Sequence, residues 1–183
     1  MAQQLARYNI AAVPLDATLQ YEIASLAQVQ FGAIEDGYIL GPRALAHVTL
    51  CQFRAATDQV ALDAFGAWPG KRDVSLSVGA FRLRAGRDEH AGKSWAYFSV
   101  ERAPALLGLQ EDCARHLVAG GLEVLTPTAT YSPHITLARL PGMPASEIAT
   151  PTFPRDGPVT FRLAVGRSTE NGVLLETLEE GGE

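Results

Sequence analysis

The sequence predicts an α+β protein with a bilobal, pseudo-symmetric fold: two lobes of largely antiparallel β-sheet with helices on the outside and a central cleft. Two observations predict this class. Short runs with a period of two, typical of strands, alternate along the chain with apolar stripes at helical spacing. A His-x-Thr-Leu phrase occurs twice, in "AHVTLCQF" at 46–53 and in "SPHITLAR" at 132–139. No linker-like segment divides the chain, so residues 1–183 are expected to form one domain.

The first half of the chain alternates between strand and helix. Strands are expected over residues 6–13 and 45–53, where polar and apolar residues alternate. A helix is expected after each strand, the first opened by Pro14 and the second capped by Thr57 or Asp58. The apolar stripes are Leu15, Leu19, Ile23 and Leu26 in the first helix and Leu62, Phe65 and Trp68 in the second.

The second half begins with an expected hairpin and continues with a helix and further strands. The hairpin joins residues 73–84 to residues 94–101 through a charged turn. A helix follows Pro104 and ends at the glycine pair 120–121. The remaining strands are expected at 134–139, 159–168 and 172–178, with a loop of five prolines from Pro141 to Pro158.

The charge pattern limits the class of ligand. The formal net charge is −5, with 20 acidic and 15 basic residues scattered along the chain. Proteins that hold long nucleic acids carry a basic stripe that contacts many phosphates, and this sequence has none. We therefore expect no long duplex partner, and any nucleic-acid ligand should be short.

The cysteines and the hydropathy indicate a cytoplasmic protein. Cys51 and Cys113 have neither the C-x-x-C spacing of a zinc site nor the density of a disulfide framework. The N-terminal residues lack the apolar core of a signal peptide, and no run of 18 apolar residues suggests a membrane segment. A reducing cytoplasm without membrane contact is the expected location.

The repeated phrase has a geometric meaning in a strand. Residues two apart face the same side, about 6.6 to 6.8 Å from each other. His47 and Thr49 should therefore share one face, and so should His134 and Thr136. If the two strands face each other across a cleft, two imidazoles flank it and two hydroxyls converge in it, which suits a phosphate. Cys51 should share the face of His47, although a buried thiol is its simplest role.

Two histidines also suit the chemistry of a phosphodiester. In-line cleavage needs a base for the attacking oxygen and an acid for the leaving oxygen, and imidazole titrates near neutral pH. A metal-dependent phosphoesterase would instead need clustered ligands, and each motif offers one histidine with no neighbouring Asp or Glu. We therefore expect neither a metal nor another cofactor.

The sequence resembles a known family, the two-histidine phosphoesterases, and within it the bacterial 2′-5′ RNA ligase-like group of RNA 2′,3′-cyclic phosphodiesterases. The residues that carry the resemblance are "HVTL" at 47–50 and "PHITLAR" at 133–139. It extends from "YNIAAVP" to "VTFRLAVGRSTENGVLLETL" and so covers nearly the whole chain.

The resemblance implies roles for the motif residues. His47 would be the general acid and His134 the general base, while Thr49 and Thr136 would hold the phosphate. Arg139 would lie against the substrate base, although a perfectly regular strand would point it to the face opposite His134. The implied activity is the opening of 2′,3′-cyclic phosphates at RNA or nucleotide ends to 2′-phosphates. We expect the protein to be a monomer.

Four alternatives stay open from the sequence. The substrate could be a 2′-5′ oligonucleotide or a small cyclic phosphate such as one derived from ADP-ribose. The cleft could also bind a nucleotide without turnover, or the same site could join RNA ends through a 2′-5′ linkage. All of them place the same phosphorus between the same two imidazoles, so the walls of the cleft decide among them.

Overall fold

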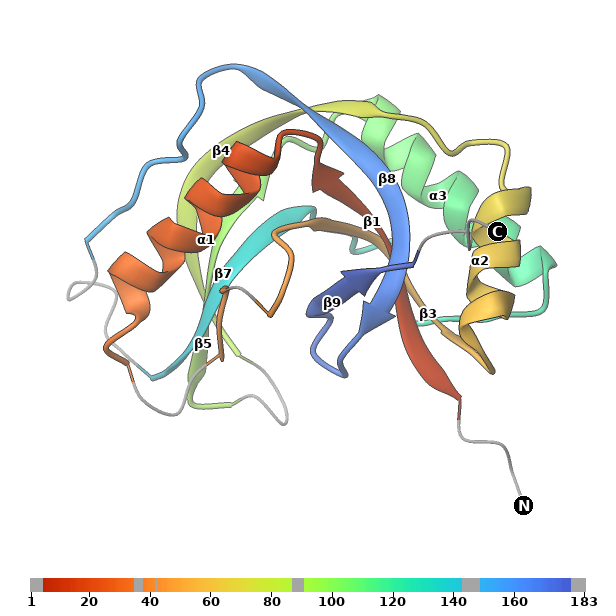
Figure 1. Ribbon diagram of the computed structural model, residues 1–183, viewed down its shortest axis with the longest axis horizontal. Coiled ribbons are helices and arrows are strands. Elements are labelled where there is room, and N and C mark those ends of the chain that lie inside the picture. Colours follow the sequence, from red (N-terminus) through yellow and green to blue (C-terminus); the bar gives the residue numbers. More distant parts are fainter. Residues whose placement is uncertain (1–4, 35–37, 42, 87–90, 143–148, 179–183) are drawn as a thin grey trace.

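A computed structural model describes residues 5–34, 38–41, 43–86, 91–142 and 149–178 (Figure 1). Within these residues the chain forms three helices and nine strands, which confirms the predicted combination of helices with a largely antiparallel sheet. The elements in chain order are β1 (Ala6–Pro14), α1 (Ala17–Phe31), β2 (Tyr38–Ile39), β3 (Val48–Ala55), α2 (Asp58–Ala67), β4 (Val74–Ala85), β5 (Lys93–Val100), α3 (Pro104–Ala119), β6 (Glu123–Val124), β7 (His134–Pro141), β8 (Pro158–Ser168) and β9 (Leu174–Thr177).

All nine strands belong to one sheet with the order β2-β7-β5-β4-β8-β1-β3-β6, and β9 pairs with β8. The strands β3 and β7 also pair with each other, through Val48 and Ile135. This extra pairing closes a circuit of strands and brings the two motif strands into contact. The separation into two lobes stays a prediction, because the sheet is continuous.

The topology repeats itself. Each half contains a long strand, a helix, a two-residue strand and a motif strand: β1, α1, β2 and β3 in the first, and β5, α3, β6 and β7 in the second. Exchanging the two sets, together with β4 and β8, only reverses the order of strands in the sheet. The short strand of each half pairs with the motif strand of the other half, since β2 joins β7 and β6 joins β3.

Helices α1 and α3 follow the same exchange, because each packs against the motif strand of the other half: α1 against β7 and α3 against β3 (Figure 1). Helix α2 packs against β8. Asp16 caps α1 by accepting a hydrogen bond from the backbone of Thr18, and the predicted cap Thr57 does the same for α2 at Val60. Buried apolar side chains from both halves form one core under these helices.

Both motif strands contain a β-bulge at the same place. In β3, Thr49 pairs with Ala11 and Cys51 pairs with Ile10, so Leu50 is the extra residue. In β7, Thr136 pairs with Tyr97 and Ala138 with Ala96, so the extra residue lies between them. Each bulge reverses the alternation of faces for the residues that follow it.

Some boundaries differ from the sequence prediction. Pro14 ends β1 and does not open the first helix, which begins after Asp16. Trp68 lies beyond the end of α2 and is fully buried there. The prediction missed β2 and β6, and part of the proline-rich loop, residues 143–148, lies outside the described residues. None of the described helices is long and apolar enough to cross a membrane.

Candidate active site

Both predicted motifs line one cavity of about 440 Å³. His47, Thr49, His134 and Thr136 all contribute to its wall. Val48 opposes Ile135 in an antiparallel pair. In this register His47 lies opposite Thr136, and Thr49 lies opposite His134. Each imidazole therefore lies beside the threonine of the other motif. We call this space the histidine cavity.

The bulge in β3 corrects the expectation for Cys51. This residue does not share the face of His47 and Thr49, because the extra residue Leu50 turns its side chain to the opposite side of the strand. There the buried thiol lies 3.7 Å from the backbone oxygen of Gln110 in α3. The face that Cys51 was expected to occupy holds Gln52, which lines the histidine cavity.

The bulge in β7 has the corresponding effect on Arg139. A regular strand would point this side chain away from His134, but the extra residue Leu137 brings it to the same face as Thr136. The guanidinium carbon of Arg139 lies 5.7 Å from the ring centre of Trp95, in a cation–π arrangement. Its Nε is buried and has no hydrogen-bond partner among the described residues.

The hydrogen bonds of His134 leave one ring nitrogen available. Its Nδ1 lies 2.7 Å from the backbone oxygen of Ser132. A carbonyl oxygen only accepts, so Nδ1 must carry a hydrogen, and in the neutral ring Nε2 then holds a lone pair. The ring packs edge-on against Tyr97 with 5.1 Å between ring centres, which limits its rotation. His134 can therefore accept a proton through Nε2.

His47 is held differently. Its Nδ1 lies 2.7 Å from the backbone oxygen of Leu45, in the same arrangement as His134. Its Nε2, however, lies 3.1 Å from the backbone oxygen of Gly172. Because both partners only accept, both ring nitrogens of His47 donate when the ring is protonated. The hydrogen bonding thus favours a neutral His134 and a protonated His47.

Burial acts on both histidines. The pKa of His47 is lowered overall, because desolvation outweighs the carbonyls of Leu45 and Gly172, which act in the opposite direction. Desolvation by the surrounding protein atoms also lowers the pKa of His134, and the positive charge of Arg84 lowers it further. His134 remains accessible to solvent because it lies in an open, concave site. A negatively charged group between the rings would raise the pKa of both histidines.

The carbonyl of Gly172 lies in the turn between β8 and β9, and Asn9 holds this turn against β3. The buried Asn9 amide donates to Gly172 O at 3.0 Å and is 3.4 Å from the hydroxyl of Thr49. Gly172 has a φ of +77°, which favours glycine. The sign of this contact in the sequence is a single asparagine in the largely apolar strand "ARYNIAAV", and Asn9 was not among the predicted site residues.

Other residues of the histidine cavity were also absent from the prediction. Arg84 in β4 lines it, and Tyr131 donates a hydrogen bond of 2.9 Å from its hydroxyl to the backbone oxygen of Thr49. Gln52 donates to the backbone oxygen of Thr169 at 3.1 Å. No Asp or Glu of the described residues lines this cavity. Its formal charge is therefore positive in a protein whose net charge is −5.

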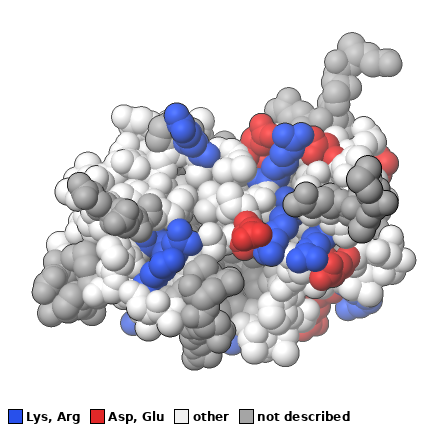
Figure 2. All heavy atoms as spheres, turned by 90° about the horizontal axis from the view of Figure 1, so that it is seen from below, with Lys and Arg blue, Asp and Glu red and all other residues white. Residues whose placement is uncertain are grey.

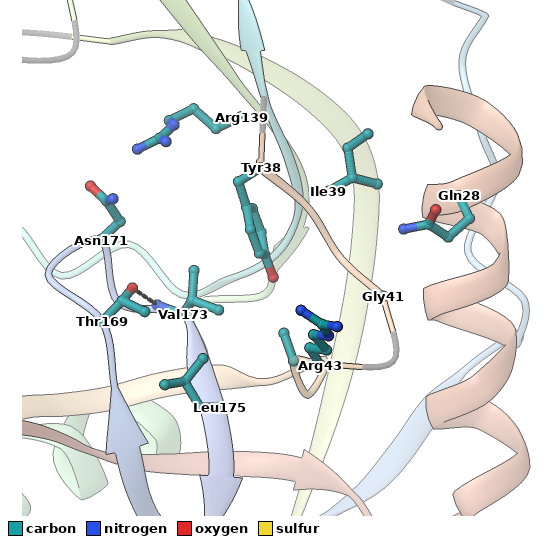
Figure 3. A pocket seen from close by; sticks show the side chains of 11 residues that line it. Gln28, Tyr38, Ile39, Gly41, Arg43, Arg139, Thr169, Asn171, Val173 and Leu175 are labelled. Carbon is teal, nitrogen blue, oxygen red and sulfur yellow. Dashed lines mark hydrogen bonds between the residues drawn. The ribbon is translucent and has the colours of Figure 1, made fainter. Parts of the chain in front are cut away.

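A second cavity, of about 520 Å³, adjoins the first and is called the arginine cavity below (Figure 3). Asn171 lines both cavities. Arg139 lines the arginine cavity and is not among the residues of the histidine cavity. Tyr38 pairs with Arg139 across β2 and β7, and burial raises the pKa of Tyr38 to about 12, so its hydroxyl stays protonated.

The described residues hold no group of three or more His, Cys, Asp or Glu side chains that could bind a metal ion. Around the histidine cavity the charged and titratable donors are two imidazoles, the guanidinium of Arg84 and the phenol of Tyr131. These groups can bind an anion and exchange protons with it.

Comparisons with known proteins define the fold. No protein-family model matches the sequence, and no curated protein is similar to it in sequence. Among solved structures, Escherichia coli LigT in its apo form superimposes with a TM-score of 0.62 over 96% of each chain, at 18% identity. LigT complexed with 3′-AMP gives 0.57 at 20% identity, also over 96% of each chain. A crystal structure of a phosphoesterase gives 0.59 at 18% identity, over 95% of this chain and 96% of that one. The chain has the LigT fold, as the resemblance predicted.

Proposed function

We propose that this protein is a cyclic phosphodiesterase of the two-histidine type that needs no metal ion. It would open 2′,3′-cyclic phosphates at the ends of RNA or nucleotides and leave a 2′-phosphate. The observation that carries the proposal is the unequal hydrogen bonding of two histidines that share one cavity with two threonines. His134 Nε2 presents a lone pair, and the proton on His47 Nε2 is shared with the carbonyl of Gly172 in the cavity wall, so it must turn from that carbonyl to the leaving oxygen for in-line cleavage.

The proposed reaction assigns one proton transfer to each ring. His134 Nε2 takes a proton from water as the water oxygen attacks phosphorus. The bond from phosphorus to the 3′ oxygen breaks, and His47 Nε2 gives its proton to that oxygen. The hydroxyls of Thr49 and Thr136 donate to the phosphate oxygens as negative charge develops on them. Protons and bonds balance, and the two rings end in exchanged states.

The charge of the two adjoining cavities, which together form the cleft, supports a short nucleotide ligand. Its described lining contains Arg43, Arg84 and Arg139 but no carboxylate. On the face shown in Figure 2, Lys and Arg side chains form separate groups among uncharged and acidic residues, not a continuous stripe. LigT, which shares the fold, was crystallised with 3′-AMP, with phosphate and with NADP+.

We further propose that Arg139 contacts the base and that the protein acts as a cytoplasmic monomer.

If a 5′-hydroxyl of a second RNA replaces the water, the same two proton transfers form a 2′-5′ phosphodiester. This ligation needs no additional residue, and we propose hydrolysis as the main direction because water is abundant in an open cleft.

The test is to incubate the protein with 2′,3′-cyclic AMP, with a 2′-5′ diadenylate and with an RNA that ends in a cyclic phosphate, in the presence of EDTA. We expect the cyclic substrates to give 2′-phosphates. Exclusive formation of 3′-phosphates, or loss of activity in EDTA, would contradict the proposal. Cleavage of the diadenylate alone would favour a 2′-5′ phosphodiesterase, and binding without turnover would favour a nucleotide-binding module.

The threonines provide a second test. Thr49→Val and Thr136→Val keep the branched shape and remove one hydroxyl each, so folding should change little. We expect each to lower kcat by about 10- to 100-fold through the loss of a donor to the phosphate. Thr160→Val, on an exposed position of β8 outside both cavities, is the matched control. Equal kinetics for all three variants would assign the two hydroxyls no part in catalysis.

A further inference from the structure

The arginine cavity contains a second cation besides Arg139. Arg43 lines this cavity, and its side chain is exposed. Arg43 makes no ion pair with an Asp or Glu of the described residues, in contrast to Arg155 and Arg167, which do. No described lining residue of the cavity is acidic. Two guanidinium groups therefore face one space without a counter-ion among the residues that the structure describes.

The walls between the two guanidinium groups are largely apolar. Ile39, Val173 and Leu175 line the cavity, and Tyr38 adds an aromatic ring. In Figure 3, Arg139 lies toward one end of Tyr38 and Arg43 lies toward its hydroxyl end. A ligand that fits this lining carries both a flat or apolar group and an anionic group.

The cavity is also close enough to the histidines for one ligand to enter both. Asn171 forms part of both walls, and Arg43 precedes His47 by four positions, a stretch of chain that spans at most about 14 Å.

We propose that Arg43 binds the phosphate on the 5′ oxygen of the nucleotide whose 2′ and 3′ oxygens face the histidines. This inference rests on the proposed function and narrows its substrate class. The preferred substrate then carries a 5′-phosphoryl group, as the terminal nucleotide of an oligonucleotide does, and a free cyclic nucleoside phosphate is a poorer substrate. Arg43 acts as a specificity residue and takes no part in the proton transfers.

The test compares two stable nucleotides that differ by one phosphate: adenosine 2′-phosphate and adenosine 2′,5′-bisphosphate. Calorimetric titration should show that the full-length protein binds the bisphosphate about tenfold more tightly, the effect of one charge-assisted contact. Arg43→Met keeps much of the side-chain length and removes the charge, so it should abolish this preference and leave the affinity for adenosine 2′-phosphate within about twofold. Added salt should reduce the preference in the wild type.

Arg115→Met is the matched control, because it removes the same charge from the exposed surface of α3, outside both cavities, and should keep the preference. Equal affinity of the wild-type protein for the two nucleotides, or binding of neither, would overturn the inference. A preference that persists in Arg43→Met would overturn it as well. Hydrolysis of 2′,3′-cyclic AMP by the same samples tests the proposed function separately, so a failure of either can be recognised.

Discussion

Replacing His47 or His134 with alanine is expected to lower kcat by about 100-fold or more, the usual contribution of a general acid or base. The double variant should be little worse than either single variant, because the two rings act on one transition state. Affinity for adenosine 2′-phosphate should largely persist through Thr49, Thr136 and the arginines. His116→Ala is the control, since that ring contacts the backbone oxygen of Ala64 outside the cavity.

The leaving group separates the two roles. A phosphodiester with a p-nitrophenolate leaving group needs little protonation, so it should restore the rate of His47→Ala far more than that of His134→Ala. The wild-type rate should follow a bell-shaped pH curve whose two apparent pKa values belong to the coupled pair. Equal restoration of both variants would show that the acid and the base are wrongly assigned.

Ile135→Ala is expected to lower the free energy of unfolding by about 2–5 kcal/mol, because it leaves a cavity in the core. Ile135 is fully buried where β3 and β7 pair, opposite Val48 and beside Phe98 of β5. Ile135→Val removes one methylene and should cost only about 0.5–1.5 kcal/mol. Urea unfolding measures both values. A loss for the alanine variant no larger than for the valine variant would show that this contact does not hold the motif strands together.

The sequence predicted most of the elements and all four motif residues of the histidine cavity. These features depend on neighbours in the chain: the apolar stripe of α1, the cap at Thr57 and the spacing of His134 and Thr136 are each visible within a few residues. Strands β2 and β6 were missed because two residues show no period, and their existence depends on pairing with the distant β7 and β3.

The two bulges were missed although the sequence contains a sign of them. After each motif two apolar residues follow in succession, Leu50 with Cys51 and Leu137 with Ala138, and all four are fully buried. This doublet shifts the alternation by one position. It should have predicted that Arg139 shares the face of Thr136 and that Cys51 does not share the face of Thr49.

The partners of the imidazoles could not be predicted in this way. The contact between His47 and Gly172 joins residues 125 positions apart, and it depends on how the turn between β8 and β9 meets β3. The place of Arg84 beside His134 likewise depends on a strand that no local pattern connects to the motif. Such contacts are set by the closure of the whole sheet.

The repeated topology has a consequence for how acid and base can differ at all. Two copies of one half-length chain, related by a twofold axis, would surround both histidines with the same groups, and symmetry would then make their proton affinities equal. In a single chain each half can diverge by itself, and here only His47 has the carbonyl of Gly172 at its Nε2. Because the two halves belong to one chain, the surroundings of the two imidazoles need not be identical. A mutation can therefore change the proton affinity of one histidine without changing that of the other.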